Sequence, residues 1–212
     1  TSGIVGYMDA GTVQRAYNAG KVTGGTYVGG IVGHLNTGTV NLIYNTGAIL
    51  GGNHTGGLIG YTNGSTNSKY STVSNGYNKG TVASTSKDYV GGVIGYGAGY
   101  TTSGNVRNNL YYDLSVIVNF SPPAGRYKPT LAFGAYQDVT YCRGLNGEVM
   151  LEDGLTVHRF TASDWTFLDT ASGTAYYPQL NGFSSSANSR IALASKTYTK
   201  VDVSGGLGTA NF

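Results

Sequence analysis

The sequence predicts an all-β protein built from stacked coils of one repeated unit, and three observations carry this prediction. The chain of 212 residues contains 35 Gly, about one residue in six, whereas Asp, Glu, Lys and Arg make up only 11%. Thr, Val, Tyr and Asn are abundant, a composition typical of strands and turns. Short apolar elements also recur in one order through the first half of the chain. Collagen is excluded because Gly does not fall at every third position.

The first recurring element is a tetrapeptide of the form Gly-apolar-apolar-Gly. Successive copies begin 27, 27 and 35 residues apart. The glycines that define the four copies are Gly3, Gly6, Gly30, Gly33, Gly57, Gly60, Gly92 and Gly95. We expect these glycines either to adopt a positive φ at corners or to lie where a side chain has no room.

Two further elements follow each tetrapeptide in the same order. A Thr-Val dipeptide occurs at 12–13, 39–40 and 72–73, and Asn105-Val106 takes its place in the fourth copy. A Tyr-Asn-x-Gly-x-Val/Ile element occurs at 17–22, 44–49 and 77–82, and Tyr111-Tyr112-Asp113 takes its place in the fourth copy. Three ordered elements in four copies establish an internal repeat.

Each 27-residue unit therefore holds three short apolar stretches that lie about nine residues apart. Such stretches are too short for ordinary helices, but they fit strands of about four to six residues joined by turns. Three strands and three turns describe one coil of a β-solenoid, similar to a parallel β-helix. In this architecture the strands of one coil pair with those of the next at a spacing of about 4.8 Å. We predict about four such coils, with the repeated Ile, Val and Leu forming inward ladders.

The composition changes after residue 118, which divides the chain into three parts. Residues 1–118 carry nine charged side chains and residues 119–212 carry fourteen. We assign 1–118 to the solenoid, 119–183 to a C-terminal closing or capping region, and 184–212 to a Ser-rich linker and a strand-like tail. The apolar residues that mark the tail are Ile191, Leu193, Val201 and Val203. A tail with this pattern is a candidate for pairing with the edge of a neighbouring copy.

The repeats resemble the GLUG motif, which is named for its Gly-Leu-apolar-Gly core. The four tetrapeptides and the Tyr-Asn-x-Gly elements carry the resemblance, together with an ending formed by Tyr111-Tyr112-Asp113, Trp165 and Tyr177-Pro178-Gln179-Leu180. It extends over residues 1–183 and leaves 184–212 unassigned. The resemblance implies a secreted or surface-attached bacterial protein with a stalk or adhesive role. It supplies no catalytic residues, because the repeat itself has none.

The residues give no basis for an enzyme, a metal site or a cofactor site, and we expect none of the three. His34, His54 and His158 lack the spacing of metal ligands, and Cys142 is expected to be a small buried residue. The net charge of +3 is spread without a basic cluster, so nucleic acid is not an expected partner. No apolar run is long enough for membrane insertion.

A tyrosine ladder is the most conspicuous candidate for contact with a partner. Tyr17, Tyr44, Tyr77 and Tyr111 occupy equivalent places in the four repeats. One interpretation is structural, since stacked rings stabilise a ladder of strands. The alternative is a strip on which carbohydrate stacks. An ice-binding array of Thr12, Thr39 and Thr72 is weaker, because only one Thr per coil repeats.

We therefore expect a non-enzymatic, extracellular structural or adhesive module of a bacterial surface protein. The chain begins inside a repeat, which suggests that earlier repeats or another molecule cover that end of the solenoid. Its expected partners are other copies in end-to-end assembly, or a glycan or protein of a host or surface. Two interpretations remain open here: a filament subunit that uses its solenoid end and its tail, and a monomeric stalk fragment. A carbohydrate-binding module is the alternative function.

Overall fold

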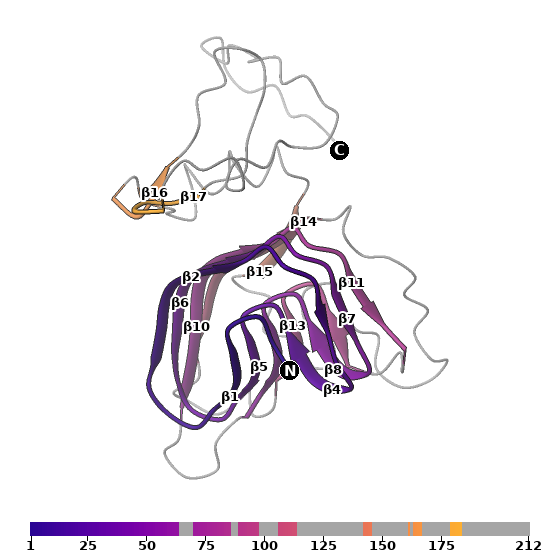
Figure 1. Cartoon of the computed structure of the whole chain (residues 1–212). Coiled ribbons are helices and arrows are strands. Elements are labelled where there is room, and N and C mark those ends of the chain that lie inside the picture. Colours follow the sequence, from indigo (N-terminus) through magenta and orange to yellow (C-terminus); the bar gives the residue numbers. More distant parts are fainter. Residues whose placement is uncertain are drawn as a thin grey trace, which may run out of the picture.

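The computed structural model (Figure 1) consists of strands stacked in parallel sheets, with no helix in its described part. The structure describes residues 1–63, 70–85, 89–97, 106–113, 142–145, 161, 163–166 and 179–183. The predicted assembly residues Ile191, Leu193, Val201 and Val203 lie outside these ranges. Within the described ranges, no helix is long and apolar enough to cross a membrane.

Four parallel sheets form the repetitive part of the molecule. Sheet I contains β1 (Val5–Met8), β5 (Val32–Leu35), β9 (Ile59–Thr62) and β13 (Ile94–Gly97). Sheet II contains β2 (Thr12–Asn18), β6 (Gly38–Asn45), β10 (Ser71–Asn78), β14 (Val106–Asp113) and β15 (Cys142–Leu145). Sheet III contains β3 (Val22–Thr23), β7 (Ile49–Gly51) and β11 (Val82–Ser84), and sheet IV contains β4 (Thr26–Gly29), β8 (Asn53–Gly56) and β12 (Val90–Gly91).

Each of the first three turns of the chain thus adds one strand to every sheet, and the fourth adds the described strands β13 and β14; we call such a turn a rung. Rung 1 is 5–29, rung 2 is 32–56, rung 3 is 59–91 and rung 4 is 94–113. Val5 pairs with Val32, Val32 with Ile59, and Ile59 with Ile94. These offsets are the spacings of 27, 27 and 35 residues that the tetrapeptides predict.

The predicted number of three strands per unit is wrong, because each complete rung contains four. The Thr-Val and Tyr-Asn elements share one strand of sheet II, which bends in its middle at a residue with positive φ. These residues are Arg15, Leu42, Asn75 and Asn109, with φ between 52° and 55°. This bend divides the strand into two apolar stretches, which the sequence pattern predicted as two separate strands. Sheets III and IV then take the rest of the repeat.

The predicted fourth member of the threonine ladder is also wrong. Thr12 pairs with Thr39 and Thr39 with Thr72, but the partner of Thr72 is Val106 rather than Asn105. The tyrosine register is as predicted, since Tyr77 pairs with Tyr111. The offset between rungs 3 and 4 in sheet II is therefore 34 residues throughout. A ladder with Val in its last place does not present the uniform hydroxyl array that ice binding requires.

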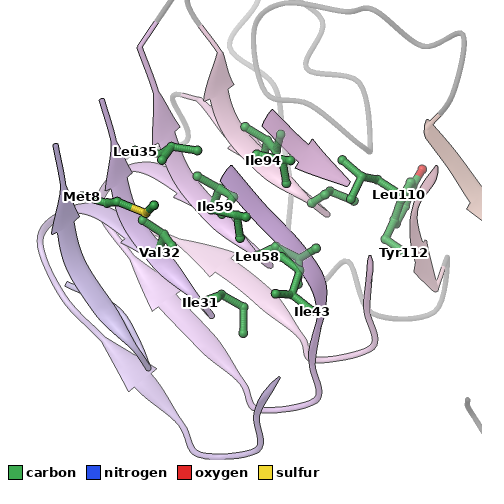
Figure 2. Close-up of a cluster of buried hydrophobic side chains, with 13 residues drawn as sticks. Met8, Ile31, Val32, Leu35, Ile43, Leu58, Ile59, Ile94, Leu110 and Tyr112 are labelled. Atoms are coloured by element: carbon green, nitrogen blue, oxygen red, sulfur yellow. The ribbon is translucent and has the colours of Figure 1, made fainter. Parts of the chain in front are cut away.

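The main core lies between sheets I and II (Figure 2). Its inward ladders come from the repeats, as predicted: Ile31, Leu58 and Val93 form one, and Val32, Ile59 and Ile94 form another, all with 0% exposure. Val40, Ile43 and Val73 face them from sheet II. A smaller core of Val22, Val28 and Ile49 lies between sheets III and IV. The apolar pairs of the tetrapeptides therefore supply the centre of the fold.

Most of the tetrapeptide glycines are required by close contacts rather than by backbone conformation; Gly6 is the exception, since a Cβ there would meet nothing within 4 Å. Among the described glycines, those with positive φ are Gly11, Gly38 and Gly182, none of which belongs to a tetrapeptide. A Cβ on Gly30 would lie 2.3 Å from the carbonyl oxygen of Gly57 and 2.6 Å from Asn45 Cγ. The first glycine of the tetrapeptide thus lets two rungs and an asparagine side chain meet at one corner.

That asparagine belongs to a buried ladder running through the stack. Asn18 Nδ2 donates to Asn45 Oδ1 at 2.7 Å, and Asn45 Nδ2 donates to Asn78 Oδ1 at 2.8 Å. Each Nδ2 also donates to the carbonyl oxygen two residues ahead, for example that of Gly47. The ladder satisfies corner carbonyl groups that have no strand partner. The Tyr-Asn and Gly-apolar-apolar-Gly elements therefore recur together because they meet at this corner.

Candidate functional site

The predicted tyrosine ladder forms on the outer side of sheet II. The rings of Tyr17 and Tyr44 are stacked with centroids 5.0 Å apart and planes 6° apart, and those of Tyr44 and Tyr77 are 5.2 Å and 6° apart. Each ring stacks on the ring of the next rung because parallel pairing places equivalent side chains one above the other. We call the surface formed by Tyr17, Tyr44 and Tyr77 the tyrosine face.

Two short strands from the C-terminal part of the chain cover this face. β16 (Trp165–Thr166) and β17 (Gln179–Leu180) pair antiparallel, and Figure 1 shows them outside sheet II. We call residues 161, 163–166 and 179–183 the β16–β17 pair. The Trp165 ring lies 6.2 Å from Tyr44 and 6.0 Å from Tyr77, centroid to centroid. Trp165 is 1% exposed, so its side chain is buried in this contact.

Polar and aromatic contacts extend the same interface to rung 1. Arg15 forms an ion pair with Asp164 and its Nη1 donates to the carbonyl oxygen of Asn181 at 3.5 Å. The Phe183 ring meets that of Tyr17 edge to face, with centroids 4.9 Å apart. The β16–β17 pair therefore touches rungs 1, 2 and 3, and a pair that spans rungs ties them together.

Burial of the ladder rings limits what the tyrosine face can contact. Tyr44, Tyr77 and Tyr111 are each only 1% exposed. Burial raises the pKa of Tyr44 and of Tyr77 well above the ordinary value of a phenol, since the anion would lose its hydration. A sugar ring has no access to rings that are buried to this extent. In this arrangement the ladder is an internal contact between two parts of the chain.

A second aromatic surface lies on sheets I and IV, and it was not predicted. It consists of seven rings that touch in one continuous strip, which we call the Tyr/His strip: Tyr7, Tyr27, His34, His54, Tyr61, Tyr89 and Tyr96. Tyr7 is 58% exposed and the other six are partly exposed. Unlike the tyrosine face, this strip is open to solvent along the described rungs.

The sequence does contain a signal for this strip. Tyr7, His34, Tyr61 and Tyr96 each follow the first residue of a tetrapeptide by four positions, and Tyr27, His54 and Tyr89 each precede one by three. Because His replaces Tyr at one place in each column, the repeat is easy to overlook. Only the fold shows that the two columns meet, since sheets I and IV are separate elements of the rung.

His34 is the titratable group that this strip affects most clearly. Its ring lies between Tyr7 and Tyr61, with centroids 4.9 and 4.7 Å away, and its Nε2 atom is buried without a hydrogen-bond partner. Tyr27 also contacts it, at 5.0 Å. Burial disfavours the imidazolium ion and lowers the pKa of His34 from 6.5. The neutral ring is therefore the form that the folded strip stabilises.

We expect the stability of the protein to depend on His34 in mildly acidic solution. Its pKa is lower in the folded than in the unfolded chain, so the stabilising contribution is fully present above pH 6.5 and is lost as the pH falls through the folded value. His34→Tyr, which copies the residue at the other rungs, should reduce this loss. The test compares urea midpoints of the two chains at pH 7.5 and 5.0. An equal decrease in both would contradict the assignment.

Within the described ranges, no three His, Cys, Asp or Glu side chains group to hold a metal ion. Comparisons of the chain with protein-family models, with curated proteins and with solved structures each find no match.

Proposed function

We propose that the chain is a β-solenoid module with a structural or adhesive role, and that it associates end to end through rung 1. The observation that carries this proposal is the location of the large apolar side chains that are exposed. Of the four in the described ranges, Tyr7 (58% exposed) belongs to rung 1, Ile4 (48%) directly precedes it, and Phe183 (38%) contacts Tyr17 of the same rung. Tyr70 is the exception.

The strand order supports the same end of the molecule as a contact surface. β1, β2, β3 and β4 are each the last strand of their sheet in the described structure. Edge strands present backbone N–H and C=O groups that pair readily with another strand. Val5 and Val13 are only partly buried there, whereas their counterparts Val32 and Val40 are fully buried. A further rung laid on this end would bury both kinds of group.

The low charge of the repeat region supports association between copies. The first 118 residues carry nine charged side chains, so little electrostatic repulsion opposes contact between copies. The resemblance to GLUG repeats supports a bacterial surface or secreted setting. In such a setting a rigid stack of parallel rungs serves as a spacer or an adhesive element. The proposal involves no catalysis.

We expect Ile4→Lys to weaken self-association. A lysine on the apolar end would place a charge against the incoming rung, as natural edge strands do to avoid pairing. Sedimentation velocity across a range of concentrations should show a roughly tenfold higher dissociation constant for Ile4→Lys than for the unmodified chain. Burying an Ile side chain is worth about 1.5 to 3 kcal/mol, and about 1.4 kcal/mol corresponds to a factor of ten. The matched control is Tyr70→Lys, which replaces another exposed apolar side chain with the same charge.

Two results would contradict the proposal. One is an unmodified chain that remains a single particle at every concentration, in sedimentation and in electron micrographs. The other is an equal loss of association in Ile4→Lys and Tyr70→Lys, which would mean that net charge and not rung 1 governs the contact.

A further inference from the structure

We propose that the tyrosine face is a docking site for the β16–β17 pair of a second copy of this chain, so that neighbouring copies exchange this pair. This inference rests on the proposed end-to-end association and names the contact that fastens it. The occupant is known because the chain's own β16–β17 pair occupies the face in the structure. Exchange of an identical element between copies is a low-cost route to assembly, since it repeats contacts that already exist.

The face and its occupant match in shape and in charge. Trp165 contacts the neighbouring rings of Tyr44 and Tyr77, and it is the only Trp of the chain. The Arg15 guanidinium meets the Asp164 carboxylate, with side chains 41% and 29% exposed. Buried aromatic anchors with a charged pair at the margin are typical of specific interfaces. The contact has this composition whether its halves come from one chain or from two.

The place of the contact also favours exchange. The chain leaves the rungs through β14 and β15, at one end of sheet II, whereas the β16–β17 pair reaches Arg15 and Tyr17 in β2, at the other end. It therefore reaches the end at which we propose that copies meet. A pair donated across that junction would hold the next copy's rungs 1 to 3.

The connecting segment is long enough for this donation. Fifteen residues, 146–160, separate Leu145 of β15 from Thr161. Fully extended they span about 50 Å, whereas the five strands of sheet II measure about 19 Å across. The segment thus exceeds the width of the stack more than twofold. A pair that can cross its own stack can also reach the equivalent face of an adjoining copy.

Concentration determines which arrangement prevails. Because residues 146–160 tether it, the chain's own pair has an effective concentration of about 1 mM at its face, so an isolated copy keeps the contact internal. When two copies also touch through rung 1, the foreign pair is held close as well, and the two arrangements compete on similar terms. Exchange should therefore accompany end-to-end association and be absent in dilute solution.

The test uses chemical cross-linking of full-length chains that carry one cysteine each. In a Cys142→Ala background, a chain with Arg15→Cys is mixed with a chain with Asp164→Cys, and a short bis-maleimide is added. At concentrations where the chain self-associates, we expect roughly tenfold more covalent dimer than from a mixture of Tyr70→Cys and Asp164→Cys chains, because docking raises the local thiol concentration. Trp165→Ala in the Asp164→Cys chain should remove the excess. Trp165 fluorescence of each parent chain confirms that the face is still covered.

The outcomes separate the two proposals. If copies associate but only a chain carrying both cysteines cross-links, within itself, the exchange is refuted and end-to-end association stands. If the chains never associate and no covalent dimer exceeds the Tyr70→Cys control, both proposals fail. If excess dimer forms but Ile4→Lys leaves it unchanged, exchange stands and the role of rung 1 is refuted.

Discussion

Gly60→Ala is expected to destabilise the fold by at least about 3 kcal/mol, whereas Gly6→Ala, at the same place of the repeat, should change the free energy of unfolding by less than about 1 kcal/mol. A Cβ on Gly60 would lie 2.6 Å from the carbonyl oxygen of Gly33 and 2.6 Å from the amide nitrogen of Val28. Both are backbone atoms of paired strands, so neither moves without disturbing a sheet. A Cβ on Gly6 meets nothing within 4 Å.

Urea unfolding followed by circular dichroism measures both changes. The comparison is matched because the two glycines occupy the same tetrapeptide position, lie in the equivalent strands β1 and β9, and have no positive φ. Differences in helix or strand propensity therefore cancel. Equal losses in the two variants would show that the repeat selects glycine for backbone freedom and not for the close approach of sheets I and IV.

Asn45→Ala should cost about 3 kcal/mol, because it leaves buried polar groups without their partners. Asn45 has 0% exposure, accepts from Asn18, and donates to Asn78 Oδ1 and to the Gly47 carbonyl oxygen, each at 2.7 to 2.8 Å. Asn18 and Asn78 retain contacts of their own with Gly20 and Gly80, which limits the loss. The Gly47 carbonyl oxygen loses its side-chain donor.

The control for this variant is Asn41→Ala, four residues earlier on the same strand. Asn41 is half-buried and accepts from Ser74 and Asn75 at 3.1 and 2.8 Å. Water can replace these contacts, so the expected loss is under about 1 kcal/mol. Urea midpoints again give the measurement. Similar losses at the two positions would mean that the buried asparagine ladder contributes no more to the free energy of unfolding than the half-buried contacts of Asn41.

The repeat elements were predictable because each belongs to one short stretch of chain. The tetrapeptides predicted the register of sheet I, and the Tyr-Asn elements predicted the pairing of Tyr17, Tyr44, Tyr77 and Tyr111 in sheet II. The all-β class followed from composition and strand-length apolar stretches. The number of strands per rung did not follow, because bends at Arg15 and its equivalents use non-Gly residues in a conformation that sequence normally assigns to Gly.

The candidate site was predictable only in part, for a different reason. The tyrosines were identified from their spacing, but the packing of Trp165 against Tyr44 and Tyr77 was not, because Trp165 lies 88 residues beyond Tyr77. The Tyr/His strip combines two columns whose members lie 20 or 28 residues apart within a rung, and it also joins neighbouring rungs, for instance through Tyr27 and His34. Contacts of this kind depend on how sheets fold against one another, which no local pattern encodes.

The repeat, its register and the inward Ile, Val and Leu ladders could thus be predicted from the sequence alone. Parallel pairing makes this possible, since it places each residue directly over its counterpart one repeat away. The tertiary structure alone decided which ladders face solvent: the β16–β17 pair covers the tyrosine face and leaves the Tyr/His strip open. Periodicity fixes contacts between neighbouring rungs, whereas coverage of an outer face depends on a single contact from a distant, non-repeating part of the chain.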